Sequence, residues 1–372
     1  MRFLSAHLTD FRNIRSAEIE FSRSFTALIG PNGQGKTNAI ESLYLVAALR
    51  PLRSVPRRAL VHTEAQRTEV AVEVDVATTG LQHQLSVALE GASRTLVKDD
   101  KKVPAASFLG HAVAVAFTPD DLVLAKGGPD GRRRFLDRAL LNIRPAYLER
   151  AMRYAKAVKD RNKVLTEHGS DTMIDAFDEI IAAEGAAIMT ARAQYVREVG
   201  DRVVENFERI CTPAPELKIR YAPSLSRGLE IDDVEATRDA FLEELGGRRG
   251  LDRQRRKTTV GPHLDDLTLH LAGKSARERA SQGQHRALVL ALKLAEITHL
   301  AEQLEEPPIL LLDDMSSELD QTRSRQLFES VAKLEGQVIL TSTEEPASLK
   351  ALLSDPDDLR IYDVDGGSIR AR

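Results

Sequence analysis

A glycine-rich octapeptide at residues 30–37 limits what this chain can fold into more than any other feature. It matches the pattern G-x-x-x-x-G-K-[ST] in full. The apolar run Phe25–Ile29 before it predicts a buried strand, and the residues from Lys36 to Leu49 predict a helix. A strand, a glycine-rich turn and a helix in this order place the turn at the end of a sheet strand. The sequence therefore predicts an α/β fold.

The octapeptide is a candidate phosphate-binding loop. Glycines let successive backbone N–H groups face an anion, and the helix N-terminus adds a positive partial charge. We expect Lys36 to reach the β- and γ-phosphates of ATP and the Thr37 hydroxyl to ligate Mg²⁺. A glycine-rich turn without a ligand is the alternative. The candidate phosphate-binding residues are Gly30, Pro31, Asn32, Gly33, Gln34, Gly35, Lys36 and Thr37.

Two adjacent acids far downstream supply a second half of this candidate site. The apolar run Ile309–Leu312 predicts a buried strand, and Asp313 and Asp314 follow it directly. A carboxylate at the end of such a strand lies at the sheet edge where nucleotide phosphates bind. We expect Asp313 to serve Mg²⁺ and Asp314 to orient or deprotonate the attacking water. Taken alone, the pair is equally typical of an acidic surface turn.

A long insertion separates the two halves, because Lys36 and Asp313 are 277 positions apart. A single strand–helix–strand unit needs only about 30 residues, so this spacing argues against a compact GTPase or kinase-like domain. Helix-forming residues dominate from Arg132 to Ile210, with a break at His168–Asp171 where Ser170 or Asp171 can cap the next helix. The sequence thus predicts an inserted helical arm, mainly a long antiparallel hairpin.

The predicted domains follow from this insertion. We expect an N-terminal lobe of an ATPase head over residues 1–130, the inserted helical arm over 131–250, and the C-terminal lobe of the head over 251–372. The dense basic run Arg248–Lys257, which carries six basic residues and one acid, lies near the return from the arm to the head. We interpret Arg248–Thr259 as a polar linker that returns to the head.

A short motif upstream of the acids explains the large insertion. The segment Ser-Gln-Gly-Gln, which begins at Ser281, 32 positions before Asp313, starts a predicted helix. Such a helix start resembles the signature motif of ABC-type ATPases, in which the serine and the helix N-terminus bind the γ-phosphate held by the other protomer's loop. The candidate residues are Ser281, Gly283 and Gln284. Residues 317–320 follow where such proteins carry a D-loop, although an ordinary helix cap remains the alternative for Ser281.

The whole chain resembles the RecF family of bacterial recombination-repair ATPases. The resemblance is carried by the following segments: Phe11-Arg12-Asn13, the octapeptide GPNGQGKT, the block PDDLVLAKGGPDGRRRFLD at 119–137, Gly261-Pro262-His263, SQGQ, and LLLDDMSSELD. The block at 119–137 occurs in far fewer protein families than a phosphate-binding loop does. It implies an ABC-type, SMC-like P-loop ATPase head of mixed and antiparallel sheets with an inserted helical arm.

The resemblance also implies a function. RecF-like proteins bind ATP with Mg²⁺, dimerise around two ATP molecules and bind duplex DNA and gap junctions. They act with RecO and RecR to load RecA, and they support the SOS response and replication restart. Weak, DNA-stimulated hydrolysis then releases the dimer. Arg12 and Asn13 are implied to touch the nucleotide, and Ser281 is implied to act on the partner protomer's site.

The chain departs from related ATPases at several positions. Position 314 carries Asp where many ABC ATPases have Glu, which shortens the side chain by one methylene and agrees with slow hydrolysis. No histidine follows the predicted strand ending at Leu340, so Thr341 or Thr343 is expected to take that place. Asp120 and Asp121 stand where a Q-loop glutamine is usual. Leu264 replaces the arginine that usually follows Gly-Pro-His.

Charge and composition limit the remaining alternatives. The formal net charge is −4, so any DNA contact must come from a local basic patch rather than from the charge of the whole chain. The basic run Arg248–Lys257 and the cluster of Arg50, Arg53, Arg57 and Arg58 are candidates, although solvated charge runs are common. One cysteine, no signal-peptide pattern and no long apolar run predict a cytoplasmic protein without a membrane segment.

Three other functions were weighed against this one. They are the ATPase subunit of a membrane transporter, an SMC-type structural head and an ABC ATPase outside DNA repair. The arm-sized insertion argues against a transporter subunit. The same insertion is far too short for an SMC coiled coil. The basic clusters alone do not exclude an ABC ATPase that acts outside DNA repair.

Overall fold

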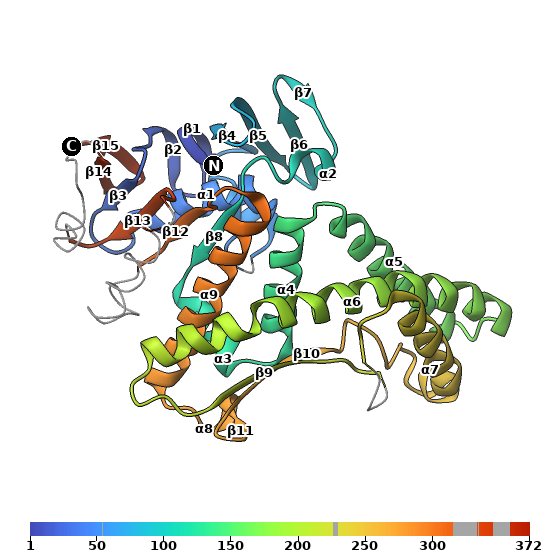
Figure 1. Ribbon diagram of the computed structural model, residues 1–372. Helices are drawn as coiled ribbons and strands as arrows, with labels where there is room; N and C mark the ends of the chain where they lie inside the picture. Colours follow the sequence, from blue (N-terminus) through green and yellow to red (C-terminus); the bar gives the residue numbers. More distant parts are fainter. Residues whose placement is uncertain (54, 226–229, 315–332, 334, 345–357) are drawn as a thin grey trace. The chain divides into compact units, whose positions relative to one another are not determined.

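The computed structural model describes residues 1–372 except 54, 226–229, 315–332, 334 and 345–357 (Figure 1). The chain divides into two compact units. The first unit comprises Met1–Asp121 and Leu292–Arg372, and the second comprises Leu122–Ala291. The chain thus leaves the first unit once and returns to it once, as an insertion requires. The three-part division predicted at residues 130 and 250 remains a prediction.

In its described part, the first unit contains two six-stranded sheets. The antiparallel sheet has the order β2-β1-β4-β5-β6-β7. Its strands are β1 (Arg2–Phe11), β2 (Ile14–Glu20), β4 (Arg67–Val76), β5 (Leu81–Glu90), β6 (Ser93–Lys98) and β7 (Lys101–Lys102). Burial alternates along β4, so one face of this sheet packs on the core and the other stays accessible. The polar segment KDDKKVP makes the β6–β7 turn and β7 itself.

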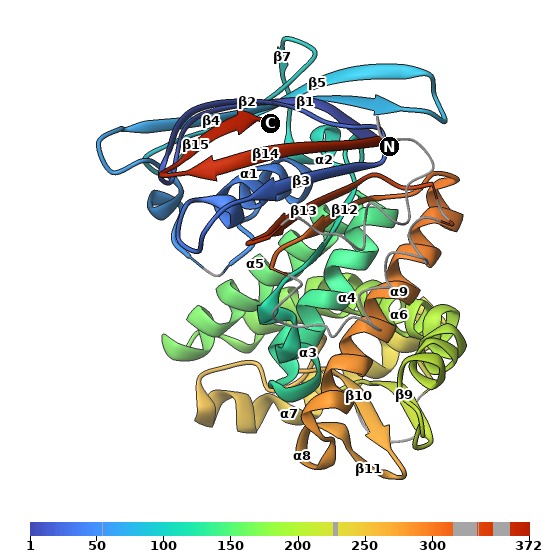
Figure 2. The ribbon, with the colours of Figure 1, turned by 90° about the vertical axis from the view of Figure 1, so that its left-hand side faces the viewer.

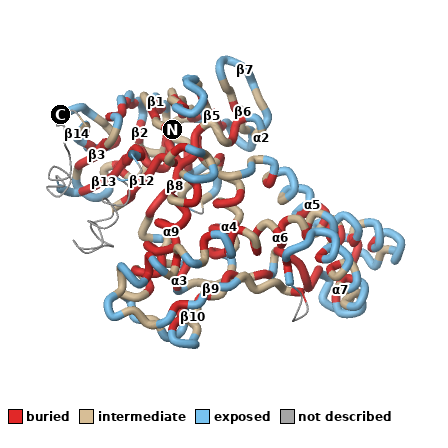
Figure 3. Tube along the Cα trace, viewed as in Figure 1, coloured by how far each residue is buried: buried red, intermediate tan, exposed pale blue. Residues whose placement is uncertain are grey.

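The second sheet is mixed and has the order β15-β14-β3-β13-β12-β8. Its strands are β3 (Phe25–Ile29), β8 (Ala114–Phe117), β12 (Ile309–Leu312), β13 (Val338–Ser342), β14 (Leu359–Asp365) and β15 (Ser368–Ala371). All neighbours are parallel except the pair β14–β15 (Figure 2). Every residue of β3, β12 and β13 is buried (Figure 3), which explains why these strands are apolar runs without alternation.

Helix α1 (Lys36–Ala48) lies between the two sheets and contacts strands of both. Its residues from Ala39 to Ala47 are all buried, as expected for a helix covered on every side. Short helices in the described part of the unit include η1 (Arg57–Leu60) and α2 (Ala105–Phe108), and η2 (Pro119–Leu122) lies at its boundary. The predicted α/β class with mixed and antiparallel sheets is therefore confirmed.

The second unit is mainly helical. It contains α3 (Val123–Lys126), α4 (Pro129–Ile143), α5 (Tyr147–Thr166), α6 (Asp171–Ile210), α7 (Val234–Arg255) and α8 (Ala276–Arg279). In its described part it also has an antiparallel sheet of β9 (Leu217–Ala222), β10 (Asp266–Leu271) and β11 (Lys274–Ser275). Helix α9 (Gln282–Leu304) begins in this unit and ends in the first.

The predicted antiparallel hairpin is formed by α5 and α6. Arg161 pairs with Asp178 and Arg153 with Glu184, so residue numbers rise on one helix as they fall on the other. Ser170 caps α6 by accepting a hydrogen bond from the Met173 N–H at 3.3 Å. The break in the helical pattern at 168–171 was therefore interpreted correctly.

The predicted linker Arg248–Thr259 is wrong over most of its length. Its first residues form the end of α7, which runs to Arg255. The charge pattern misled because three of these arginines pair with acids: Arg248 with Glu244, Arg249 with Asp175 and Asp178, and Arg253 with Asp171. Asp252 is fully buried in the same helix. The basic run thus belongs to a packed helix.

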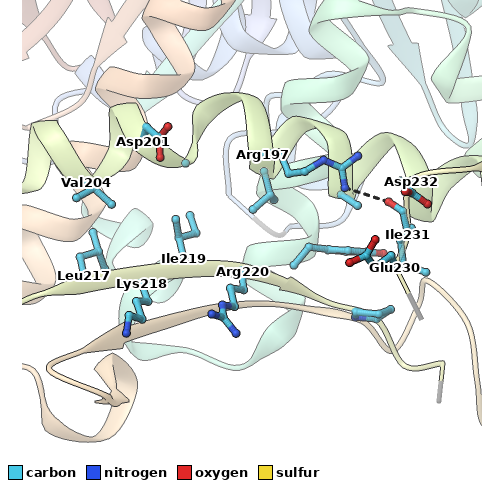
Figure 4. A pocket seen from close by; sticks show the side chains of 15 residues that line it. Arg197, Asp201, Val204, Leu217, Lys218, Ile219, Arg220, Glu230, Ile231 and Asp232 are labelled. Carbon is cyan, nitrogen blue, oxygen red and sulfur yellow. Dashed lines mark hydrogen bonds between the residues drawn. The ribbon is translucent and has the colours of Figure 1, made fainter. Parts of the chain in front are cut away.

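A groove of about 800 Å³ lies between α6 and β9 (Figure 4). Arg197 of α6 closes one end by donating a hydrogen bond to the Ile231 carbonyl at 3.1 Å. The groove wall mixes aliphatic side chains such as Val204 with charges of both signs. It contains none of the residues predicted for the nucleotide site.

The predicted D-loop at 317–320 lies outside the described residues. Within the part of the chain that the structure describes, no helix combines the length and the apolar character needed to cross a bilayer.

Candidate nucleotide-binding site

The octapeptide forms the turn between β3 and α1, as predicted. Gly33 and Gly35 have φ of +82° and +113°, which L side chains rarely adopt. A Cβ on Gly30 would lie 2.2 Å from the Val364 carbonyl oxygen, so a side chain does not fit there. The first turn of α1 has backbone N–H groups without a partner in the helix, as in every helix. Backbone shape and donors together fit a phosphate.

Lys36 lies along the loop that it is expected to serve. Its Nζ donates hydrogen bonds to the carbonyls of Gly30 and Pro31 at 2.7 and 2.8 Å. Burial lowers the pKa of Lys36 from its usual value, and the nearby Asp314 and Asp313 charges oppose that shift. The ammonium group is thus held within the loop by two neutral acceptors, which an anionic ligand can replace.

The two halves of the predicted site meet directly. Thr37 Oγ1 donates to Asp313 Oδ1 at 2.7 Å, although 276 positions separate these residues. Thr341, at the end of β13, also donates to Asp313 Oδ1, at 3.0 Å. Asp313 is 2% exposed, and this burial raises its pKa, while the two hydroxyl donors oppose the shift. A buried carboxylate beside a hydroxyl and a phosphate-binding loop is a suitable ligand pair for Mg²⁺.

Thr341 has a second contact that ties it to the adjacent acid. The Asp314 N–H donates to Thr341 Oγ1 at 2.9 Å. Asp314 has a φ of +49°, which places its backbone in the left-handed region. The hydroxyl of Thr341 therefore links both acids. The sequence signal for Thr341 was its position directly after the predicted strand ending at Leu340, which is extended to Ser342 in β13.

The turn between β1 and β2 reaches the loop through Asn13. Its Nδ2 donates to the Gln34 carbonyl at 3.1 Å, and Asn38 of α1 donates to its Oδ1 at 2.8 Å. A Cβ on Gly35 would lie 2.8 Å from the Asn13 amide. Arg12 is anchored separately, to Glu41 of α1. The structure thus brings Asn13 to the loop and Arg12 to α1, and the nucleotide contacts implied for both residues remain predictions.

The turn between β14 and β15 also contacts the loop, which sequence reasoning missed. The N–H groups of Gly366 and Gly367 donate to Gln34, at 2.7 Å to Oε1 and 2.8 Å to the carbonyl. The only sequence signal was the glycine pair, which indicates a turn but no partner. The C-terminal hairpin therefore supports the loop from the side of β14.

The arginine cluster after α1 is divided among different partners. Arg53 Nη2 lies 3.6 Å from Asp313 Oδ2, with half of its side chain exposed. Arg57 donates to the Ala92 carbonyl at 3.2 Å. Arg53 is therefore the member of the cluster that reaches the candidate metal ligand.

The signature residues Ser281, Gly283 and Gln284 begin α9 in the second unit. Gln284 N–H donates to Ser281 Oγ at 3.2 Å, and Ser281 N–H donates to Gln284 Oε1 at 2.8 Å. This reciprocal pair is a capping box. The ordinary-cap interpretation of Ser281 is thus realised locally, and a phosphate-binding role remains a prediction.

Other charged and polar side chains of the quoted motifs bind partners within the protein. Arg132 binds Asp266 through two hydrogen bonds of 2.7 and 2.8 Å, so the partner of this arginine is an acid of its own unit. Asp121 caps its own turn by accepting from the Thr118 N–H, and lies 3.6 Å from Lys293. His263 Nδ1 lies 2.6 Å from the Tyr154 hydroxyl. Among the described residues, no group of three or more His, Cys, Asp or Glu is arranged to hold a metal ion.

Comparisons with known proteins agree over the full length of the chain. The sequence profile of the family described as RecF/RecN/SMC N terminal domain matches residues 4–360. The DNA replication and repair protein RecF of Anaeromyxobacter sp. (strain Fw109-5) is 41% identical over 375 residues, covering 99% of each chain. The protein of the same name from Myxococcus xanthus (strain DK1622) is 39% identical, covering 100% of this chain and 98% of its own.

Solved structures give the same result. The structure of the recombination mediator protein RecF-ATP in the RecFOR pathway matches with a TM-score of 0.90 and 27% identity, covering 100% of this chain and 97% of the other. An Smc head bound to the C-winged helix domain of ScpA matches with a TM-score of 0.55 and 15% identity, which supports the SMC-like fold alone. This chain therefore belongs to the RecF family of DNA replication and repair proteins, with an SMC-like ABC ATPase head.

Proposed function

We propose that this protein is an ATP-dependent DNA-binding protein of recombinational repair whose ATP-bound form is a dimer. The contact of Thr37 with Asp313 carries the proposal. It joins the phosphate-binding loop to an acid at the end of a neighbouring buried strand. The relatives are called DNA replication and repair proteins, and one solved RecF structure is described with ATP in the RecFOR pathway.

The residues present fit ATP with Mg²⁺. The glycine conformations leave the loop backbone open to a phosphate, and the Lys36 ammonium donates to two neutral carbonyls of the loop. Thr37 and Asp313 would hold Mg²⁺, which supplies positive charge to the β- and γ-phosphates. Arg12 has a buried Nη2 with no hydrogen-bond partner among the described residues, which is a spare donor for an anion.

Hydrolysis is assigned to the acids at the end of β12. Asp314 orients or deprotonates the attacking water, and the hydrogen bond from its N–H to Thr341 fixes its backbone. Its side chain is one methylene shorter than the glutamate common at this position, so we expect slow turnover. Slow turnover suits a switch that releases DNA, because the ATP-bound state then persists.

Dimerisation makes the second phosphate contact. Ser281 and the N-terminus of α9 bind the γ-phosphate of the partner protomer, as a helix N-terminus binds any anion. DNA bound across the dimer favours the closed state, and ATP and DNA then strengthen each other's binding. RecR and RecO are the proposed partners, with RecA loading at single-strand gaps, support of the SOS response and a cytoplasmic location as consequences.

The proposal is tested by light scattering of the wild type with and without ATP and Mg²⁺, and with duplex DNA at two salt concentrations. Lys36→Met removes the phosphate-binding ammonium, and Ser281→Arg blocks the trans contact. Lys101→Met, which changes an exposed lysine of β7, is the matched control. We expect ATP to dimerise the wild type and the control only, and DNA binding to rise on dimerisation and fall with salt. A wild type that stays monomeric with ATP, with unchanged DNA affinity, would refute the model.

A further inference from the structure

Glu41 binds two segments near the nucleotide site, one that precedes α1 in the sequence and one that follows it. It lies on α1, and its side chain is 1% exposed. Its Oε2 accepts a hydrogen bond from Arg12 Nε at 2.5 Å, and its Oε1 accepts one from the Arg53 backbone N–H at 3.3 Å. Arg12 belongs to the β1–β2 turn, and Arg53 belongs to the segment after α1. One buried carboxylate therefore holds both segments against the helix that begins with Lys36.

Both segments continue from Glu41 to the candidate site. Asn13, next to Arg12, donates to the Gln34 carbonyl of the phosphate-binding loop. The guanidinium of Arg53 reaches to within 3.6 Å of Asp313 Oδ2. On one side, the Arg12 held by Glu41 is the sequence neighbour of a residue that contacts the loop. On the other side, the side chain of Arg53 connects the Glu41 contact to Asp313.

The way Glu41 holds Arg12 leaves part of the guanidinium available. Glu41 uses Nε, while the Nη2 of Arg12 is buried and has no hydrogen-bond partner in the described part of the chain. A buried donor without a partner costs free energy, so an acceptor supplied by a ligand is favoured there. The planar guanidinium can bind a carboxylate at one edge and a phosphate at the other, which a lysine cannot do.

We propose that Glu41 is a positioning residue for nucleotide binding. It fixes the guanidinium of Arg12 so that its remaining donors face phosphate oxygens, and it holds the segment of Arg53 near Asp313. This inference rests on the proposed function, because it assumes that ATP binds at the loop. In this role Glu41 connects α1 to Arg12 and Arg53, two arginines that belong to other segments of the chain.

The test is ATP affinity, measured by anisotropy of a fluorescent ATP analogue with Mg²⁺. Glu41→Gln keeps the shape and an acceptor for the Arg53 N–H but removes the charge that orients Arg12. We expect its Kd to rise about tenfold. Arg12→Gln should raise the Kd to a similar extent, and the double variant should be no weaker than either alone, because Glu41 acts through Arg12. Glu64→Gln is the matched control, since Glu64 pairs with the exposed Arg15 on neighbouring β2.

Arg12→Lys keeps the result interpretable if Glu41→Gln does not fold. It keeps a cation beside the buried carboxylate but lacks the second edge, so we expect a folded protein with weakened ATP binding. An unchanged Kd in Glu41→Gln or Arg12→Lys, or additive effects of Glu41→Gln and Arg12→Gln, would overturn the inference while leaving the proposed function intact. Absence of ATP binding by the wild type would overturn both.

Discussion

Loss of one buried arginine should destabilise the helical unit strongly. Arg161 of α5 is fully buried and binds Asp178 of α6 and Asp252 of α7, each at 2.6 Å, and Thr258 Oγ1 at 3.0 Å. Arg161→Met keeps most of the side-chain volume but leaves two buried carboxylates without this cation. Breaking a buried ion pair in this way costs about 3–5 kcal/mol.

The remaining contacts place the expected loss at the lower end of that range. Asp178 keeps Arg249, at 3.0 Å, and Asp252 keeps two donors from Thr259. We therefore expect a loss of about 3 kcal/mol, which corresponds to roughly 6–12 °C in Tm for a unit of this size. Differential scanning calorimetry without ligand measures it. Replacing both acids by Asn in the same variant should recover part of the loss, because no buried charge is then left unpaired.

A second arginine on the same helix supplies the control. Arg153 pairs with Glu184 of α6 at 2.6 Å, but half of its side chain is exposed. Arg153→Met should therefore lower Tm far less than Arg161→Met does, because exposed ion pairs contribute little to stability. If Arg161→Met lowers Tm no more than Arg153→Met does, the buried network does not stabilise the hairpin and the reasoning fails.

Two further predictions concern the site. Burial raises the pKa of Asp313, so folding disfavours its charged form; the penalty is full above the folded pKa and disappears below the unfolded value of 3.8. Without nucleotide, Asp313→Asn should therefore raise Tm at pH 7, and the increase in Tm should be smaller near pH 4. The same variant should lose ATP hydrolysis. A Tm below that of the wild type at pH 7 would contradict this. Gly35→Ala meets Asn13 at 2.8 Å and a φ of +113°, so thermal unfolding should show a loss of about 1–3 kcal/mol, whereas an unchanged Tm would mean that the loop relaxes freely.

Local patterns were sufficient to predict the central part of the site. The octapeptide, the strand before it and the helix after it are neighbours in sequence, so their arrangement follows from short-range rules. Asp313 was found because a buried strand ending in a carboxylate has one usual place in such a sheet. The meeting of Thr37 and Asp313 follows from these two patterns together.

Contacts between distant segments could not be predicted where neither segment carries a recognisable motif. The glycine turn after β14 supports Gln34 from more than 300 positions away, and nothing in its composition indicates that partner. The basic run ending α7 was taken for a linker because its acidic partners, such as Asp171 and Asp175, lie about 80 positions earlier. The sequence shows how many charged side chains a segment has. Whether these side chains are exposed to solvent depends on the acids with which they form salt bridges.

Helix α9 has a mechanical consequence, because it passes without a break from one compact unit into the other between Ala291 and Leu292. Ser281, just before its first residue, lies eleven residues from that crossing, which is roughly 16 Å along a helix. A tilt of about 10° at the crossing would move this serine by about 3 Å, the length of one hydrogen bond. The phosphate contact proposed for Ser281 therefore depends on the direction of α9 at this crossing, and a substitution near Ala291 and Leu292 should alter it.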